Sequence, residues 1–139
     1  MLCGLEIACD QGLAGHSDAD VATHAVIDAI LGAAGMGDIG ALFPDTDPAY
    51  EGASSIALLG EVMTRVATAG WRVVNVDLVI VAERPKLAAH RAAMTALLAA
   101  ALRVAGDAVG VKATTTEGMG FEGRGEGISA TAVCLLEQA

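Results

Sequence analysis

Polar side chains recur every four residues between positions 20 and 28. At this spacing Asp20, His24 and Asp28 share one face of a helix in an otherwise apolar segment. His16 and Ser17 come just before them, where the helix N-terminus would offer backbone N–H groups and a positive dipole to a phosphate. The pattern predicts an anion site beside an imidazole that can bind a metal. A solvated helix face is the alternative interpretation.

A run of threonines followed by glycines forms a second candidate site. Thr114, Thr115 and Thr116 lead through Glu117 into a glycine-rich segment that contains Arg124. Hydroxyls and glycine N–H groups can surround phosphate oxygens, and a guanidinium can donate two parallel hydrogen bonds to a phosphate or a carboxylate. The segment predicts a phosphate site, although a flexible hairpin would have a similar composition.

A third group of polar residues lies in the acidic loop between positions 37 and 52. Asp38, Asp45 and Asp47 can accept hydrogen bonds from a polyol, although solvated turns often have this composition. Lys86 adds a further anion contact elsewhere. A phosphate about 4 Å from such a carboxylate would be repelled by roughly 4 kcal/mol per charge pair at an effective dielectric of about 20. A diphosphate site here therefore requires divalent metal ions.

Alternating strands and helices must position these groups. Helices are predicted over residues 17–35, 54–70 and 85–106, with Ser17 as N-cap of the first and Pro85 opening the last. Strands are predicted over residues 3–8, 71–82, 109–114 and 128–136, with Val74, Val76, Leu78 and Ile80 on one face of the second. The pattern predicts an α+β domain, with a single-layer mixed four-stranded sheet and helices on one face, chorismate-mutase-like or ferredoxin-like.

The composition limits the function classes. The 139 residues are 54% hydrophobic but only 3% aromatic, which predicts a single domain that buries apolar surface between subunits. A formal charge of -9 argues against nucleic-acid binding. No stretch is long and apolar enough to span a membrane and no secretory signal is visible, so a cytoplasmic location is predicted. Cys3, Cys9 and Cys134 include no C-x-x-C pair, which argues against a disulfide framework.

Three separated segments resemble one known family. GLAGHSDADVATHAVIDAILGAAGMGDIGALFPDTDP, ERPKL and VKATTTEGMGFEGRGEGISATAV follow the order and spacing of 2-C-methyl-D-erythritol 2,4-cyclodiphosphate synthases of the non-mevalonate isoprenoid route. The likeness covers nearly the whole chain from Gly4 onward. It implies a homotrimer with active sites between subunits. It also implies that the 2-phosphate of 4-diphosphocytidyl-2-C-methyl-D-erythritol 2-phosphate attacks the β-phosphorus, with CMP leaving.

The resemblance implies roles for individual residues. His16 and Thr115 would stabilise the transition state, His24 would bind Zn²⁺ or another divalent cation, and Glu117 would bind Mg²⁺ or Mn²⁺ on the diphosphate. The methylerythritol phosphate would be surrounded by His16, Ser17, Asp28, Asp38, Ile39, Gly40, Phe43, Pro44, Asp45, Thr46 and Asp47. The cytidine nucleotide would be bound by Ala82, Pro85, Lys86, Leu87, Thr114, Thr115, Thr116, Glu117, Phe121 and Arg124.

The first residues depart from the family pattern. Members begin with a strand bearing Gly-x-Asp-x-His, which supplies two zinc ligands, whereas LCGLEIACDQGLAGH resembles the stretch that follows that strand. Because catalytic zinc sites generally have three protein ligands, His24 alone would hold zinc weakly. Either the reading frame starts upstream of Met1, which we favour, or the protein is genuinely shorter. The alternative function is a non-catalytic trimer that binds cytidine nucleotides or isoprenoid diphosphates.

Overall fold

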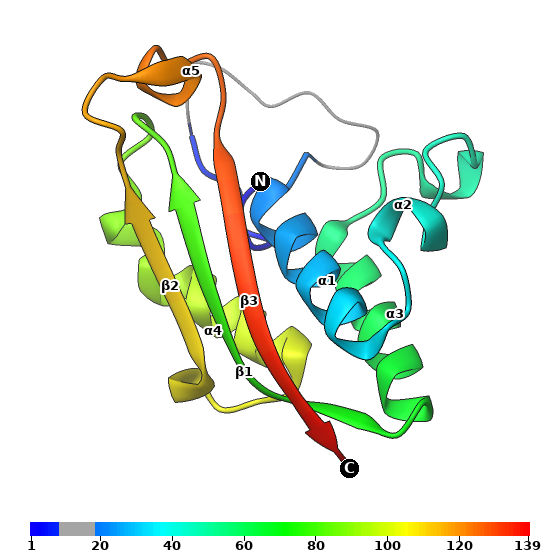
Figure 1. Ribbon diagram of the computed structural model, residues 1–139. Helices are drawn as coiled ribbons and strands as arrows, with labels where there is room; N and C mark the ends of the chain where they lie inside the picture. Colours follow the sequence, from blue (N-terminus) through cyan, green and yellow to red (C-terminus); the bar gives the residue numbers. More distant parts are fainter. Residues whose placement is uncertain (9–18) are drawn as a thin grey trace.

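The computed structural model describes residues 1–8 and 19–139, which form a sheet with helices on one face (Figure 1). The strands are β1 (Trp71–Val81), β2 (Val109–Thr114) and β3 (Ser129–Gln138), in the order β2-β1-β3. β1 pairs parallel with β2 and antiparallel with β3, so the predicted mixed α+β architecture is confirmed. The helices are α1 (Val21–Ala34), α2 (Ile39–Leu42), α3 (Ser55–Thr68), α4 (Arg91–Leu102) and α5 (Gly120–Gly123).

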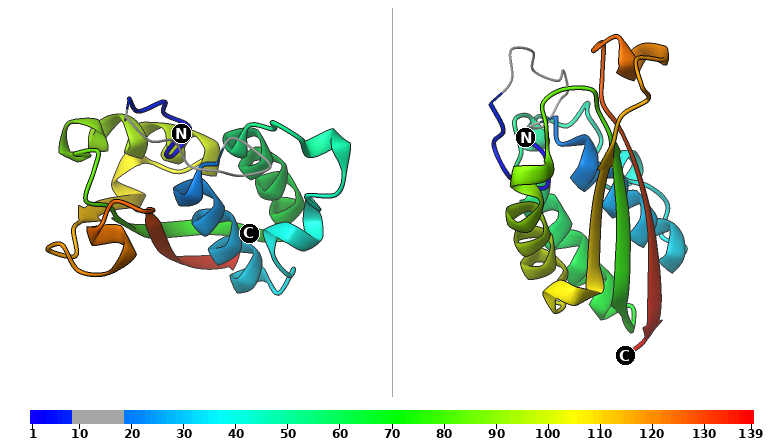
Figure 2. Two further views of the ribbon diagram at one scale, coloured as in Figure 1. Left: turned by 90° about the horizontal axis from the view of Figure 1, so that it is seen from above. Right: turned by 90° about the vertical axis from the view of Figure 1, so that its left-hand side faces the viewer.

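The long helices α1, α3 and α4 form one layer over the sheet (Figure 2). α1 packs on β3 and β1, α3 on β1, and α4 on β2. Ile27, Leu59, Leu78 and Leu98, one from each of α1, α3, β1 and α4, are completely buried in a single core. Burial of each such side chain contributes roughly 1.5–3 kcal/mol, which holds the helices in place. None of the described helices is long and apolar enough to cross a membrane.

No described helix covers the other face of the sheet (Figure 2). Lys112 Nζ of β2 lies 2.9 Å from Asp77 Oδ2 of β1 on this face. Val133 and Leu135 of β3 point the same way and are 68% and 57% exposed. The face is therefore charged where β1 meets β2 and apolar along β3.

The predicted strand over residues 3–8 is wrong, and the described sheet has three strands instead of four. Leu2 and Leu5 form an isolated antiparallel bridge around Cys3 and Gly4, whose φ angles are 53° and 77°. A two-residue turn of this kind reverses the chain instead of extending it. A Cβ on Gly4 would lie 2.3 Å from a side chain of α3, so the turn closes tightly against that helix.

The first helix begins later than predicted. Ser17 lies outside the described residues, and α1 starts at Val21 with Asp20 as its N-cap. Asp20 Oδ1 accepts a hydrogen bond of 2.9 Å from the N–H of Thr23. The same carboxylate also accepts from the N–H groups of the N-terminal turn. A contact between segments far apart in sequence thus selects this cap, which local pattern alone did not reveal.

Pro85 does not open a helix, contrary to the prediction. The Arg84–Pro85 peptide bond is cis, and the chain passes through a 3₁₀ turn at Ala88–His90 before α4 begins at Arg91. The irregular segment between β1 and α4 forms part of the wall of a pocket described below. The predicted helix is therefore replaced there by a loop that can line a ligand site.

The buried face of β1 also differs from the alternation in the sequence. Val73, Val76, Leu78 and Ile80 are buried, whereas Val74 is only half-buried. The pairing with β3 skips Val74, which is the extra residue of a β-bulge. An inserted residue shifts the alternation by one, so the inward face passes from position 73 to position 76.

Candidate functional site

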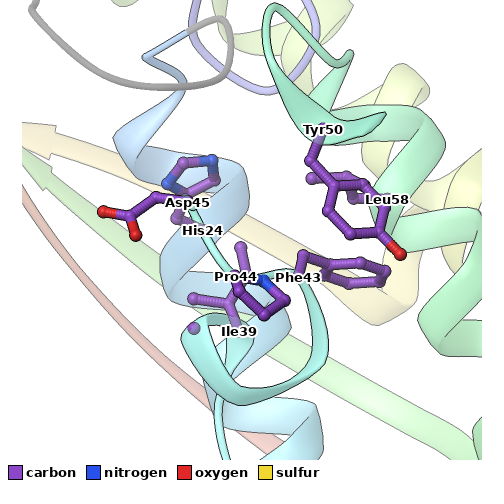
Figure 3. Close-up of a pocket in the computed structure, with 8 residues that line it drawn as sticks. His24, Ile39, Phe43, Pro44, Asp45, Tyr50 and Leu58 are labelled. Carbon is purple, nitrogen blue, oxygen red and sulfur yellow. The ribbon is translucent and has the colours of Figure 1, made fainter. Parts of the chain in front are cut away.

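A pocket of about 310 Å³ opens between α1, the α2 loop and α3 (Figure 3). We call it the His24 pocket; it is lined by His24, Ile39, Gly40, Phe43, Pro44, Asp45, Tyr50 and Leu58. The imidazole and the Asp45 carboxylate lie at one end, and the rings of Phe43 and Tyr50 lie at the other (Figure 3). The pocket thus combines a polar end with an apolar wall, as expected for a small polar ligand that carries a hydrocarbon part.

A buried hydroxyl orients the imidazole. His24 Nε2 and Ser55 Oγ are 2.8 Å apart and share a hydrogen bond. Ser55 is completely buried and is the first residue of α3, so the bond ties α1 to α3. A hydrogen bond of this kind fixes the plane of a ligand histidine and assigns one ring nitrogen to the protein.

Three predicted ligand carboxylates hold the backbone of the acidic loop. Asp28 Oδ1 accepts a hydrogen bond of 2.8 Å from the N–H of Ile39. Asp38 caps α2 and Asp47 caps the following 3₁₀ turn, each through a backbone N–H two or three residues further on. The carboxylates therefore shape the loop that bears Phe43, and solvated turn chemistry accounts for part of the acidic pattern.

Phe43 anchors this loop in the core. Its side chain is 6% exposed, and its ring packs edge-on against Tyr50 with centroids 5.2 Å apart. The Arg65 guanidinium of α3 lies 5.8 Å from the centre of the Phe43 ring. Aromatic and cation–π contacts of this kind each contribute roughly 0.5–1.5 kcal/mol. The pocket wall is consequently packed before any ligand binds.

A second pocket, of about 150 Å³, lies where β1 and β2 end beside the start of α4. We call it the Lys86 pocket; it is lined by Ala82, Pro85, Lys86, Leu87, Ala88, Arg91, Ala113, Thr114 and Thr115. The N–H of Ala82 donates to Thr114 O at 3.0 Å, which continues the β1–β2 pairing up to the pocket. In Figure 1 this region and α2 lie on opposite flanks of the chain.

The hydroxyl oxygen of Thr115 accepts a hydrogen bond within the turn that follows β2. Thr115 Oγ1 accepts this bond of 3.2 Å from the N–H of Glu117, which has a φ of 55°. Thr114 Oγ1 donates to the backbone oxygen of Thr115 at 3.2 Å. Because the Thr115 oxygen is the acceptor in this turn, the hydroxyl proton can be donated to a ligand oxygen in the pocket.

The glycine-rich segment is a closed turn around α5. A Cβ on Gly123 would lie 2.2 Å from the carbonyl carbon of Gly118, so the two backbones meet at a distance that only glycine permits. Arg124 Nε lies 2.7 Å from Glu126 Oε1, and Phe121 is 46% exposed. Neither Arg124 nor Phe121 lines the Lys86 pocket of a single chain.

Within residues 1–8 and 19–139, no three His, Cys, Asp or Glu side chains gather closely enough to hold a metal ion. Zinc sites generally require three protein ligands, so the described residues around His24 do not fit a zinc site by themselves. Mg²⁺ is commonly held by one or two carboxylates together with substrate phosphates. Glu117, exposed beside Thr115, fits that more modest requirement.

The model of the YgbB family matches residues 1–137. A 2-C-methyl-D-erythritol 2,4-cyclodiphosphate synthase from Methylococcus capsulatus is 60% identical over 136 residues, covering 98% of this chain and 86% of the relative. The chain belongs to the YgbB family. A solved 2C-methyl-D-erythritol-2,4-cyclodiphosphate synthase in its CDP-bound form is 42% identical with a TM-score of 0.90, covering 99% of this chain and 89% of that one. The bifunctional IspDF from Campylobacter jejuni is also 42% identical, with a TM-score of 0.95; all of this chain matches 38% of that longer chain.

The predicted site residues of this YgbB-family chain fall into two separate groups. The His24 pocket brings together His24, Ile39, Gly40, Phe43, Pro44 and Asp45, and the Lys86 pocket brings together Ala82, Pro85, Lys86, Leu87, Thr114 and Thr115. Asp28, Asp38, Thr46, Asp47, Thr116, Glu117, Phe121 and Arg124 line neither pocket. His16 and Ser17 lie outside the described residues.

Sequence reasoning missed several residues at these two pockets. Tyr50 and Leu58 line the first, Ser55 holds its imidazole, and Ala88 and Arg91 line the second. Tyr50 could have been found as the single tyrosine of the chain, placed in the acidic loop a few residues after Phe43. Arg91 could have been found as a lone cation among alanines. Ser55 gave no signal, because it looks like an ordinary residue at a helix start.

Proposed function

We propose that this chain is a subunit of a 2-C-methyl-D-erythritol 2,4-cyclodiphosphate synthase, a phosphorus–oxygen lyase. An oxygen of the 2-phosphate of 4-diphosphocytidyl-2-C-methyl-D-erythritol 2-phosphate attacks the β-phosphorus. One P–O bond forms to close the ring, and the P–O bond to CMP breaks. The family match and the 60% identical synthase support this assignment, as does a relative that has been solved with CDP.

The observation that carries the proposal is the placement of the two pockets on opposite flanks of one chain (Figure 1). This placement favours a site in which the nucleotide end of the substrate lies against one chain and the methylerythritol phosphate end lies against another. The Lys86 pocket of one subunit and the His24 pocket of the next together make one site. A closed homotrimer joined through the uncovered sheet face would bury Val133 and Leu135, which are exposed here.

Catalysis in this site rests on positioning and charge stabilisation, because the nucleophile belongs to the substrate. The Thr115 hydroxyl donates to an oxygen of the diphosphate, and Lys86 adds positive charge at the nucleotide end. Asp45 and neighbouring loop residues bind the methylerythritol phosphate in the His24 pocket. His16, outside the described residues, is assigned to transition-state stabilisation through the family resemblance alone.

Divalent cations complete this proposal. A bound Mg²⁺ or Mn²⁺ would neutralise the negative charge of the phosphate oxygens. Without it, a chain of formal net charge -9 would repel them. Glu117 would hold such an ion together with the substrate phosphates. A Zn²⁺ site at His24 needs ligands beyond those that the described residues offer.

The test is release of CMP from the cytidine diphosphate ester, measured with the full chain in Mg²⁺, Mn²⁺ or Zn²⁺. Thr115→Val should lower kcat by about a hundredfold, because loss of one hydrogen-bond donor to developing charge costs roughly 10²–10³ in rate. Thr68→Val is the matched control: its hydroxyl donates to Thr64 O at the end of α3, Thr68 lines neither pocket, and activity should stay unchanged.

Two results would count against the proposal. Absence of CMP release by the unmodified chain with every cation would remove the enzymatic assignment and favour a binding module. Full activity of Thr115→Val would show that the turn after β2 does not act on the diphosphate.

A further inference from the structure

Most cations of this chain have a partner of their own. The chain has eight Lys and Arg residues against seventeen Asp and Glu. Arg65, Arg72, Lys112 and Arg124 form ion pairs with Glu61, Glu137, Asp77 and Glu126, and Arg103 donates to Thr64 Oγ1 at 3.0 Å. In so acidic a chain, a partner for each cation is the expected arrangement.

Three cations depart from this rule, and they are neighbours. Arg84, Lys86 and Arg91 form no ion pair or hydrogen bond with the described residues, and all three are exposed. They lie in one short segment, which carries the wall of the Lys86 pocket. Glu83, the single acid of that segment, forms no ion pair with them either. This segment therefore keeps its positive charge available for an external anion.

Of the two arginines in this segment, only Arg91 lines the Lys86 pocket. Arg84 instead directs its Nη2 toward Gly125, to within 3.4 Å of where a Cβ would stand. Arg91 is also the first residue of α4, and the N-cap His90 makes no side-chain capping bond. A cation in the first turn opposes the helix dipole, so the position is electrostatically unfavourable without a nearby anion.

The size of the pocket indicates which part of a nucleotide meets these cations. About 150 Å³ is less than the roughly 300 Å³ at which drug-sized ligand sites begin, so the pocket suits a pyrimidine base better than a whole nucleotide. The phosphates of a bound nucleotide must then follow the rim. Exposed Lys86 and Arg91 line the pocket and can reach that rim.

We propose that Arg91 is a further substrate-binding residue, whose guanidinium donates hydrogen bonds to the phosphates of the cytidine nucleotide beside Lys86. This inference rests on the proposed function, because it takes the Lys86 pocket as the nucleotide site. A planar guanidinium can donate two parallel hydrogen bonds to two phosphate oxygens, whereas an ammonium acts as a compact point charge. Arg91 therefore contributes to the preference for a charged nucleotide over the uncharged nucleoside.

Isothermal titration calorimetry of the full chain with CDP and with cytidine tests this role. Arg91→Gln should weaken CDP binding about tenfold, the equivalent of one hydrogen bond to a charged group, and change cytidine binding by less than about twofold. Added salt should weaken CDP binding less steeply for Arg91→Gln than for the unmodified chain, since one charge contact is missing. Arg103→Gln removes the same charge from the opposite end of α4, outside both pockets, and should bind CDP as the unmodified chain does.

The possible outcomes separate this inference from the proposed function. If the unmodified chain binds neither CDP nor cytidine, the nucleotide site itself is wrong. If the unmodified chain binds CDP and Arg91→Gln binds it equally well, the role of Arg91 is wrong and the function stands. Equal losses for CDP and cytidine would assign Arg91 to pocket shape and overturn the phosphate contact. A loss for Arg103→Gln as large as that for Arg91→Gln would mean that net charge alone is responsible.

Discussion

Replacing Asp20 by Ala tests whether one buried carboxylate joins the N-terminal turn to α1. Asp20 is completely buried; Oδ1 accepts from the N–H groups of Cys3 and Thr23, each at 2.9 Å, and Oδ2 accepts from the N–H of Gly4 at 2.7 Å. Loss of the helix cap costs about 1 kcal/mol, and each turn N–H left without an acceptor costs about 1–3 kcal/mol. The free energy of unfolding should fall by at least about 3 kcal/mol.

Urea denaturation followed by circular dichroism at one fixed protein concentration measures this loss. Asp38→Ala is the matched control, because it removes the exposed cap of the four-residue helix α2 and should cost no more than about 1 kcal/mol. The loss in free energy of unfolding for Asp20→Asn should lie between those of the two alanine variants. The amide keeps one oxygen as an acceptor, but its NH₂ group would face backbone N–H groups that are donors themselves. A loss below about 1 kcal/mol for Asp20→Ala, or one equal to that of Asp38→Ala, would refute the reasoning.

Two further predictions concern thiol chemistry and assembly. Burial, followed by the charge of Asp20, raises the pKa of the Cys3 thiol to about 12, so at pH 9 only about a thousandth of it is thiolate. Peptide mapping after treatment with a thiol reagent at pH 9 should find Cys3 unmodified in the native chain and modified in urea; rapid native labelling would contradict this. Leu135→Asp should convert a trimer to monomers in sedimentation velocity, whereas Leu97→Asp on α4 should leave the mass unchanged. An unaltered mass for Leu135→Asp would exclude β3 from the interface.

The middle and the end of the chain could be predicted because local pattern and tertiary structure agree there. β1, β2 and β3 lie within about two residues of the predicted strands, and α3 lies within the predicted 54–70 helix. β-branched runs and glycine boundaries determine these elements without help from distant segments. The mixed sheet with helices on one face followed from that order of elements.

The errors occur where distant segments decide the local structure. The start of α1 depends on Asp20 meeting the turn at Cys3 and Gly4, a contact between residues 17 positions apart. The bulge at Val74 depends on the register against β3, near the other end of the chain. The loop before α4 lies against the end of β2, and the two segments line one pocket although they are far apart in the sequence.

The candidate site could be predicted for a related reason, but only in part. The Thr114–Thr115 pair and Lys86 carry chemistry in their residue types, and both line the same pocket. Ser55 and Arg91 act through their placement. Ser55 matters because its hydroxyl lies 2.8 Å from His24 Nε2. Arg91 matters because it lines the Lys86 pocket and forms no ion pair with the described residues. Residues whose role depends on a neighbour from another element are the ones that a pattern cannot reveal.

The polar stripe on α1 shows how one spacing can serve structure and chemistry together. Asp20, His24 and Asp28 lie on successive turns, and each binds a different segment: the N-terminal turn, Ser55 of α3, and Ile39 of the α2 loop. The solvated-face interpretation is therefore wrong for Asp20, which is completely buried, and incomplete for Asp28. Because the bonds of His24 and Asp28 tie α1 to both walls of the His24 pocket, the imidazole is oriented by the same contacts that assemble the pocket. A change in either of these two bonds should alter ligand binding as well as stability.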